Sequence, residues 1–380
     1  MKTRPFCNEI RALGEALITR YGADKTIDCG INGPYDDQET KVRDLSHLIV
    51  ITALEGLLFD RVEMRQRVLV MAEELMALRG SDGMYRIRMK PGKDECNGVL
   101  GHAWVMEAFI YAYKATAQSS FLDEAVRVAR MHGFHKGLGL WCRPLRGVDA
   151  GAIDYTLNHQ LWYAATLMEL NRFVDDPVFK EETEVFFVRL DKNFKTNRQG
   201  RITHSIYNRV GLPASVRQCI KKDKILLNEL LGRPSFKYKE EGYHLFNLMA
   251  FARINRLDPS LSVFRTGCFQ QALKYLGSPL FKEGLLSGKI VLDASLHNRI
   301  ADPSEKEINI YGYPYNVPGF ELMYVQEVFK TDRLAAEECL SEQFRLTFDE
   351  GTGFFGKRCH DKTTINYRIY EYYRYLEIIK

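Results

Sequence analysis

The stretch DYTLNHQLWYAATLMEL, residues 154–170, shows the pattern that sets the fold of this chain: an acidic residue, a polar or aromatic pair, then a long apolar run. Five other stretches repeat it: VRDLSHLIVITALEGLLF (42–59), NGVLGHAWVMEAFIYAY (97–113), EEGYHLFNLMAFARI (240–254), NVPGFELMYVQEVF (316–329) and TTINYRIYEYYRYLEI (363–378). A unit that recurs every roughly 50 to 85 residues is typical of a stacked or closed helical array. We expect each run to form a buried inner helix.

More polar segments lie between these runs, and their apolar residues recur at three- and four-residue spacing, which predicts amphipathic outer helices. They are 62–79, 121–131, 178–190, 261–276 and 334–345. Segment 5–20 is of the same kind but has no inner run before it, and the last inner run, 364–379, has no outer segment after it. Pairing these two closes a ring of six inner and six outer helices, an all-α (α/α)6 toroid. The alternative is an open α-solenoid, whose end faces need capping.

Short glycine-led pieces follow the outer segments, and we expect each to form a β-hairpin before the next inner helix. They are 82–89, 139–144, 199–207, 288–300 and 351–359. Five such insertions in register strengthen the repeat. Because no Pro/Gly/Ser-rich linker divides the chain, we expect a single toroid domain over residues 1–380.

Composition excludes several classes of function. The 53 basic and 49 acidic residues leave a formal charge of +4 without any Lys/Arg block, which argues against nucleic-acid binding. No apolar run is long enough for a signal peptide or a membrane span, and the eight cysteines form no CxxC pair. These features predict a soluble cytoplasmic protein with reduced thiols. HExxH, P-loop and Rossmann motifs are absent, so we expect neither a metal site nor a cofactor.

Acidic residues gather before the expected inner helices. In a ring these helices run parallel, so their N-termini meet at one mouth. The acids are Asp36, Asp37, Glu39, Asp94, Glu95, Asp149, Asp154, Glu240, Glu241, Glu305, Glu307 and Asp361. Many acids before helices are only capping residues. Carboxylates that face each other across a mouth repel, however, so one with a raised pKa can serve as a general acid.

Aromatic and basic residues accompany the acids. The stretch YGYPYNVPG (311–319) places Tyr313 and Tyr315 directly before an inner helix, and with Trp104 they are candidates for stacking against a sugar, although aromatic residues at helical spacing are often core. Arg43 opens the first inner helix, where helix N-termini already favour anions. The combination predicts an anionic sugar such as a uronic acid, with salt bridges to neighbouring acids as the alternative role for the basic residues.

Histidines occupy equivalent positions at the starts of four inner helices. They are His47, His102, His159 and His244, and Asn158 stands beside the third. A single histidine there is usually a core residue, but four in register are expected to face a common cavity.

Three segments resemble a known family: NGPYDDQETKVRDLSHLIV (32–50), DECNGVLGHAWVMEA (94–108) and DYTLNHQLWYAAT (154–166). They resemble the AglQ-type proteins of surface-glycan and N-glycosylation gene clusters, which are related to (α/α)6 glycoside hydrolases. The repeat plan is also similar to that of unsaturated glucuronyl hydrolases and N-acylglucosamine 2-epimerases. The GPYxDxET and NHQLW strings are the specific ones, and the first departs from the family pattern at Lys41, where proline is usual.

The resemblance implies an enzyme of glycan metabolism whose partner is an oligosaccharide or polysaccharide. Glucuronyl hydrolases of similar fold use aspartates on neighbouring repeats, which here correspond to Asp94 and Asp154. A glycoside hydrolase needs two such carboxylates. We therefore expect Asp154 to act as general acid/base and Asp94 as its partner. Asp37 and Glu321 are further candidates.

In the same hypothesis His102 and His159 orient sugar hydroxyls and Arg43 holds a carboxylate. A uronyl epimerase or lyase is the nearest alternative, with a proton abstracted by Tyr313, Tyr315, His159 or His244 and the enolate stabilised by arginine. The third possibility is a non-catalytic glycan-binding or scaffold protein.

Overall fold

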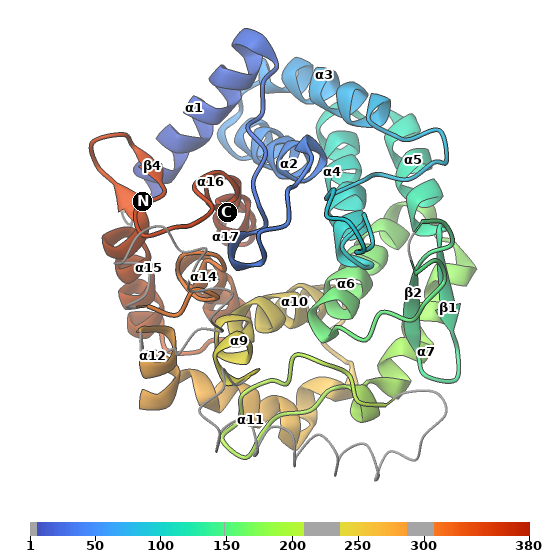
Figure 1. Ribbon diagram of the computed structural model, residues 1–380, viewed down its shortest axis with the longest axis vertical. Coiled ribbons are helices and arrows are strands. Elements are labelled where there is room, and N and C mark those ends of the chain that lie inside the picture. The colour runs from blue at the N-terminus through green and yellow to red at the C-terminus, as the bar shows by residue number, and fades with distance from the viewer. Residues whose placement is uncertain (1–5, 148, 209–235, 287–307) are drawn as a thin grey trace.

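The inner helices close into a ring in the computed structural model, which describes residues 6–147, 149–208, 236–286 and 308–380 (Figure 1). They are α2 (Lys41–Phe59), α4 (Leu100–Thr116), α6 (Leu157–Val174), α10 (His244–Leu257), α14 (Pro318–Phe329), and the pair α16 (Thr364–Tyr367) and α17 (Tyr370–Ile379). Each packs against the next, and α17 packs back onto α2. The predicted (α/α)6 toroid is confirmed, and the open solenoid is excluded.

The outer layer surrounds this ring (Figure 1). It consists of α1 (Cys7–Asp24), α3 (Met64–Ala77), α5 (Ser119–Ala129), α7 (Pro177–Asn193), α11 (Gly267–Leu276) with α12 (Pro279–Leu286), and α15 (Arg333–Thr347). The predicted segment 261–276 is split, because the short 3-10 helix η2 (Ser262–Arg265) precedes α11, whose N-cap is Thr266. Helix α1 lies beside α2 and places Gly14 against the Tyr373 ring of α17, so it closes the ring as its sequence predicts.

The two layers differ in burial as their sequences require. In α4 every residue from Leu100 to Ala112 is buried, which is the behaviour of a helix that is apolar all round. In α5 the buried residues recur on one face, among them Phe121, Ala125 and Val128. Side-chain caps fix some helix starts: Thr40 accepts a hydrogen bond from the Val42 amide at α2, and Asp176 accepts one from the Val178 amide at α7.

Of the five predicted hairpins, two coincide with paired strands. Strand β2 (Leu140–Pro144) pairs with β1 (His132–His135), and β3 (Phe348–Asp349) pairs with β4 (Phe354–Phe355). Segment 82–89 is not a hairpin, because its backbone pairs with residues 38–40 of the first unit instead. Segment 199–207 forms only isolated bridges, to Thr156 and Thr196. Segment 288–300 lies outside the described residues.

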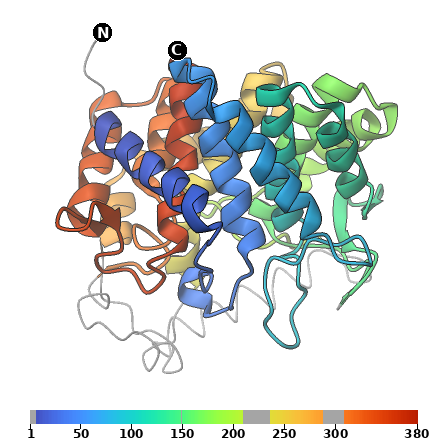
Figure 2. The ribbon, with the colours of Figure 1, turned by 90° about the horizontal axis from the view of Figure 1, so that it is seen from above.

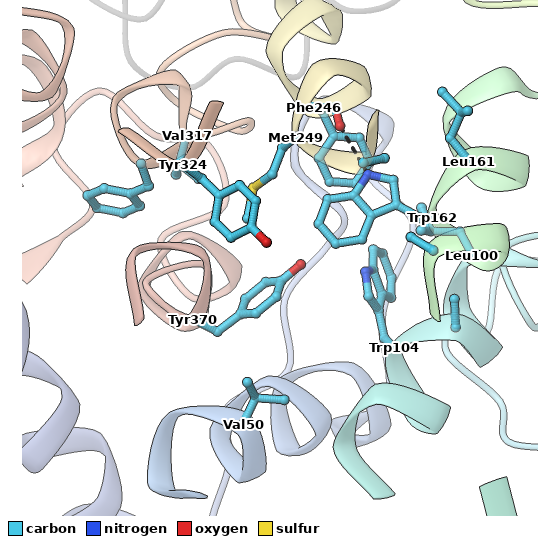
Figure 3. Close-up of a cluster of buried hydrophobic side chains, with 14 of the residues drawn as sticks. Val50, Leu100, Trp104, Leu161, Trp162, Phe246, Met249, Val317, Tyr324 and Tyr370 are labelled. Atoms are coloured by element: carbon cyan, nitrogen blue, oxygen red, sulfur yellow. Dashed lines mark hydrogen bonds between the residues drawn. The ribbon is translucent and has the colours of Figure 1, made fainter. Parts of the chain in front are cut away.

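Large aromatic side chains fill the middle of the ring. Trp104, Trp162, Tyr324 and Tyr370 come from four different inner helices and point toward one another (Figure 3). The Trp162 ring stacks on Phe246 at 4.6 Å between centroids, and its indole N–H donates to the Phe246 carbonyl. The ring is therefore a packed core and not an open pore.

Four buried charges link inner helices below these aromatic side chains, toward the C-terminal ends of the helices. Arg253 of α10 lies 3.1 Å from Glu107 of α4 and 3.1 Å from Glu169 of α6. Arg374 of α17 reaches the same two carboxylates, at 3.3 and 3.1 Å. We call these four residues the axial charge cluster. The cluster contains two positive and two negative side chains. Charged side chains can be buried only when opposite charges compensate one another in this way.

The loops that precede the inner helices lie together at one end of the ring (Figure 2). No helix in the described ranges has both the length and the apolar character that a membrane span needs. The seven cysteines in those ranges carry free thiols, and Cys219 lies outside them. The single domain over residues 1–380 stays a prediction.

Candidate functional site

A pocket of about 300 Å³ lies at this end of the ring, and all six inner-helix units line it. One residue from each unit illustrates this: Arg43, Asp94, His159, Tyr243, Tyr315 and Arg368. Each stands within or just before the first turns of its inner helix, or in the loop that leads to it. The repeated sequence pattern therefore converges on one cavity, at the place that the sequence predicts.

His159 and Asp154 form a hydrogen-bonded pair at the third unit. His159 Nδ1 lies 2.7 Å from Asp154 Oδ2, and the His159 side chain is partly exposed to the pocket. Asp154 is fully buried and also accepts the backbone N–H groups of Val99 and Thr156, both at 3.0 Å. Burial alone would raise the pKa of Asp154, but neighbouring His159 and these hydrogen bonds hold it well below its usual range.

The electrostatics of this pair fix the histidine tautomer. Because Asp154 stays ionised, His159 Nδ1 carries the proton and donates it, which leaves Nε2 as the nitrogen that can accept a proton. Gly98 packs directly on the pair with a φ of +67°. A Cβ at that position would lie 1.9 Å from Asp154 Oδ2 and 2.5 Å from His159 Nδ1. Only glycine allows this close approach.

Asp94 lines the pocket from the second unit, held by the protein on both oxygens. Oδ1 accepts the Gly98 amide at 2.6 Å, and Oδ2 accepts Arg88 Nη2 at 2.8 Å. The same guanidinium donates to buried Asp37 at 3.0 Å, and Lys90 and Lys93 also pair with Asp37. Although burial raises the pKa of Asp37, its hydrogen bonds to the two lysines lower it overall. Asp37 lies behind the pocket wall, where it anchors three cations.

The wall of the pocket is predominantly basic. Among the described residues that line it, six are cationic and two are acidic. The cations are Arg43, Arg88, Lys93, Arg143, Lys239 and Arg368, and the acids are Asp94 and Asp149. Cations gathered around a small cavity raise the local concentration of anionic ligands.

Arg43 is buried at the start of α2. It donates to Glu39 at 2.6 Å and to Asn32 at 3.2 Å, and its guanidinium lies 4.5 Å from the centroid of the Trp104 ring. The Arg43 Nε has no hydrogen-bond partner among the described residues, and neither does the indole nitrogen of Trp104. Both side chains line the pocket, as does Asn158, whose carbonyl oxygen also has no such partner. Their binding roles stay predictions.

Tyrosines from three units form another part of the pocket wall. Tyr35 and Tyr243 join their hydroxyls at 2.9 Å, and the Tyr315 ring packs edge-on against both, at 5.9 and 6.1 Å. The Tyr315 hydroxyl donates to Asn32 at 2.7 Å. All three rings line the pocket and offer flat apolar surface beside polar groups, which is the environment that a sugar ring needs.

Arg368 lines the pocket but is held entirely by the protein. Nε and Nη2 donate to Glu371, Nη2 also donates to Glu321 at 3.0 Å, and Nη1 donates to the Tyr315 carbonyl and to Asn316. Glu321 and Glu371 are both fully buried. Burial and their mutual repulsion raise the pKa of Glu321 well above its usual value, and burial raises that of Glu371 to about 7. Glu321 therefore lies behind the pocket, as a partner of Arg368.

The expected common cavity of four histidines is not formed, because of His47, His102, His159 and His244 only His159 lines the pocket. His102 Nδ1 donates to His132, whose own Nδ1 donates to the Cys142 carbonyl, so His102 braces α4 against the β1–β2 hairpin. His244 accepts the Ile202 amide and donates to the Ala272 carbonyl in the outer layer. Burial lowers the pKa of both histidines, which suits neutral core residues.

His47 is also a core residue, stacked on Tyr370 at 4.2 Å between ring centroids. Burial holds its pKa well below the usual value. Tyr313 turns away from the mouth, because its hydroxyl lies 3.3 Å from Cys339 in the outer helix α15. The sequence cannot distinguish inward from outward positions at a helix start, since a one-residue rotation moves a side chain by a quarter turn.

Several of the remaining acids support the structure. Glu240 and Glu241 pair with Arg201, and Asp361 accepts the amides of Ile31 and Gly33. Glu305 and Glu307 lie outside the described residues. In the part of the chain that the structure describes, no group of three or more His, Cys, Asp or Glu side chains is arranged to hold a metal ion.

Sequence reasoning missed Lys239, His204 and Asn97, which line the pocket. Lys239 belongs to the short helix α9 (Phe236–Gly242), directly before α10. Lys239 stands five residues before His244, as Asp154 stands five residues before His159, so the repeat itself was the available signal. The axial charge cluster was also missed, although each member interrupts an apolar run: WVMEAF, LMELN, FARIN and YYRYL.

No protein-family model matches the chain. Archaeal glycosylation protein Q of Haloferax volcanii is 29% identical over 370 residues, which cover 94% of each chain. Among solved structures, cellobiose 2-epimerase from Bacillus thermoamylovorans superposes with a TM-score of 0.62 at 12% identity, covering 98% of both chains. An unsaturated glucuronyl hydrolase from Bacillus sp. GL1 gives 0.59 at 9% identity, covering 98% of this chain and 95% of that one.

These similarities span nearly the whole chain. The structural matches are at low sequence identity and establish the fold, while the sequence match is to a glycosylation protein, the kind of protein that segments 32–50, 94–108 and 154–166 resemble. The chain thus resembles the AglQ-type glycosylation proteins and has the (α/α)6 toroid fold found in sugar epimerases and glycoside hydrolases.

Proposed function

We propose that this protein is an enzyme that processes a uronic-acid-containing glycan, with His159 moving a proton in an epimerase- or lyase-type reaction. The observation that carries the proposal is the pairing of buried Asp154 with His159, whose side chain is partly exposed to a basic pocket. A histidine whose tautomer is fixed by a buried carboxylate is a typical general base. Similarity to a protein named for glycosylation supports a glycan as the ligand.

In this mechanism His159 Nε2 removes the proton from the carbon next to the sugar carboxylate. The C–H electron pair moves toward the carboxylate and forms an enolate, which the cations of the pocket stabilise. Delivery of a proton from water on the opposite face gives the epimer, and His159 then releases its own proton to solvent. Departure of the leaving oxygen from the next carbon, with the proton taken from His159, gives an unsaturated sugar instead. Asp154 stabilises the imidazolium that forms, and its three hydrogen bonds suit that positioning role better than direct proton transfer.

A glycoside hydrolase is the second candidate, and the position of Asp94 favours it. This carboxylate lines the pocket, where it can act on water or on the anomeric carbon. In this reaction His159 has to begin as the imidazolium, so that Nε2 can protonate the leaving oxygen. The two reactions make different demands on Asp94. In the hydrolase it is essential, whereas in the epimerase or lyase it serves binding.

The test uses His159→Gln, Asp154→Asn and Asp94→Asn variants of the full chain in deuterated water. The substrate is an oligosaccharide with a terminal glucuronic acid, for hydrolysis, and an internal one that carries a sugar on the carbon from which a lyase expels its leaving group. NMR detects deuterium on carbon, a new double bond or a released sugar. For an epimerase or lyase we expect the His159 variant to lose roughly 10²–10⁴-fold in turnover. Asp154→Asn should lose a large part of turnover, and Asp94→Asn should keep measurable activity. His135→Gln, outside the pocket, is the control.

Hydrolysis without deuterium on carbon, abolished by Asp94→Asn, would replace the first mechanism with the second. Tight binding by the wild-type protein without turnover of any offered glycan would contradict both and favour a binding or scaffold protein. Circular dichroism of each variant separates lost chemistry from lost folding.

A further inference from the structure

Lys239 differs from the other cations of the pocket in its surroundings. It belongs to α9, and its Nζ lies 4.8 Å from the centroid of the Tyr35 ring and 5.8 Å from that of Tyr243. Aromatic faces at these distances attract a cation but do not neutralise its charge. The ammonium group is thus placed against the tyrosine wall, in the cavity that also contains His159.

The other five pocket cations already have carboxylate partners. The pairs are Arg43 with Glu39, Arg88 with Asp37 and Asp94, Lys93 with Asp37, Arg143 with Asp149, and Arg368 with Glu321 and Glu371. Within the described ranges no carboxylate pairs with Lys239. Burial and, secondarily, the charge of Lys93 lower the pKa of Lys239 to about 8. At neutral pH the amine is still mostly protonated, so it is a poorly solvated charge without a counterion.

We propose that Lys239 binds the carboxylate of the sugar and determines the preference of the pocket for a uronic acid over a neutral hexose. The inference rests on the proposed function, because it takes the pocket as the sugar site. A carboxylate at Lys239 supplies the missing counterion, and the cation that holds it also stabilises the charge of an enolate formed beside it. Lys239 is therefore a binding residue that acts on specificity.

The experiment measures binding by calorimetry in a His159→Gln background, so that the ligand is not consumed. The two probes are a glucuronic-acid-terminated disaccharide and its carboxyl-reduced, neutral counterpart. We expect the charged disaccharide to bind at least about tenfold more tightly than the neutral one. Adding Lys239→Met should remove most of this preference by weakening only the charged ligand, and Lys239→Arg should keep part of it. Lys274→Met, an exposed position on α11, changes the net charge equally and should have no effect.

A second measurement follows the Lys239 amine directly by NMR of isotope-labelled lysine side chains. The titratable groups recorded beside it are Lys93, Tyr35 and Tyr243. Bound carboxylate favours the protonated amine, so the pKa of Lys239 should rise when the charged disaccharide is added and stay unchanged with the neutral one.

Three results would overturn the inference, and they are distinguishable. If Lys239→Met keeps the charge preference while His159→Gln abolishes turnover, the specificity role fails and the proposed function stands. If Lys239→Met weakens both disaccharides equally, Lys239 only maintains the shape of the pocket. If neither disaccharide binds to His159→Gln or to the wild-type protein, the sugar site fails and the inference fails with it.

Discussion

At the level of single residues, Gly98 is a position where the site leaves no room for a side chain. We predict that Gly98→Ala sharply lowers turnover, because the new Cβ would collide with Asp154 Oδ2 and His159 Nδ1 and push the pair apart. The φ of +67° adds backbone strain of roughly 1 kcal/mol or more. Turnover and urea unfolding of the same preparation measure the two effects.

Gly92 is a matched control. It also lines the pocket and has a positive φ of +75°, but a Cβ there meets nothing within 4 Å. Gly92→Ala should therefore lose only the stability that the positive φ costs an alanine, and its turnover should stay close to that of the wild type. Equal loss of turnover in both variants would show that the contact of Gly98 with the Asp154–His159 pair has no special importance.

The residues of the site were only partly predictable. The repeat places His159, Asp154, Asp94 and Arg43 at the mouth because N-terminal turns of parallel helices share one end. It does not tell which way each side chain points, and His102 and His244 consequently proved to be braces toward the outer layer. The direction in which a side chain points depends on the exact residue at which its helix begins. Helix boundaries are the feature that a sequence pattern predicts least reliably.

At the level of helices, Glu321 of α14 and Glu371 of α17 meet on one arginine. The pKa of Glu371 is raised from 4.5 to about 7, so the folded protein keeps a proton that the unfolded chain releases between these values. Across this window the free energy of unfolding of the wild-type protein falls as pH rises. We predict that Glu371→Gln makes the free energy of unfolding depend less steeply on pH. Between pH 4.5 and pH 8 the stability of the variant should rise, relative to that of the wild type, by on the order of 2 kcal/mol.

Urea unfolding at a series of pH values measures this difference. Glutamine keeps an acceptor for Arg368 and removes the charge, so the packing between α14 and α17 is preserved. Glu338→Gln, on the exposed face of α15, serves as the control and should leave the pH dependence unchanged. Parallel stability curves for wild type and Glu371→Gln would contradict the raised pKa of Glu371.

The helices themselves were well predicted, and the hairpins only in part. An inner or outer helix is decided by the apolar pattern along its own length, as α4 and α5 show. Segment 82–89 has the composition of a hairpin, but its backbone pairs with residues 38–40, which are more than forty residues away. A local pattern cannot specify a distant partner.

At the level of the whole molecule, ring closure follows from counting units, since α1 supplies the outer helix that the last inner helix lacks. The interactions that hold the inner helices together at the centre of the ring could not be predicted by counting units. In the sequence, each charged residue of the axial charge cluster is a single charge inside an apolar run. Only the structure shows that the four charges, which come from four helices, form ion pairs with one another. Such long-range pairing leaves no local signal in one sequence.

The axial charge cluster leads to a prediction about global stability. Arg374→Met leaves Glu107 and Glu169 with one arginine fewer in a buried site, and breaking a buried pair in this way costs about 3–5 kcal/mol. Lys282→Met, whose partner Glu338 is exposed, should cost under about 1 kcal/mol. Adding Glu107→Gln to Arg374→Met removes one of the uncompensated charges. The double variant should therefore lose less unfolding free energy than the two single variants lose in sum. Strictly additive losses in urea unfolding would mean that the four charges act independently, and the helices would then be held at the axis by the aromatic packing above them.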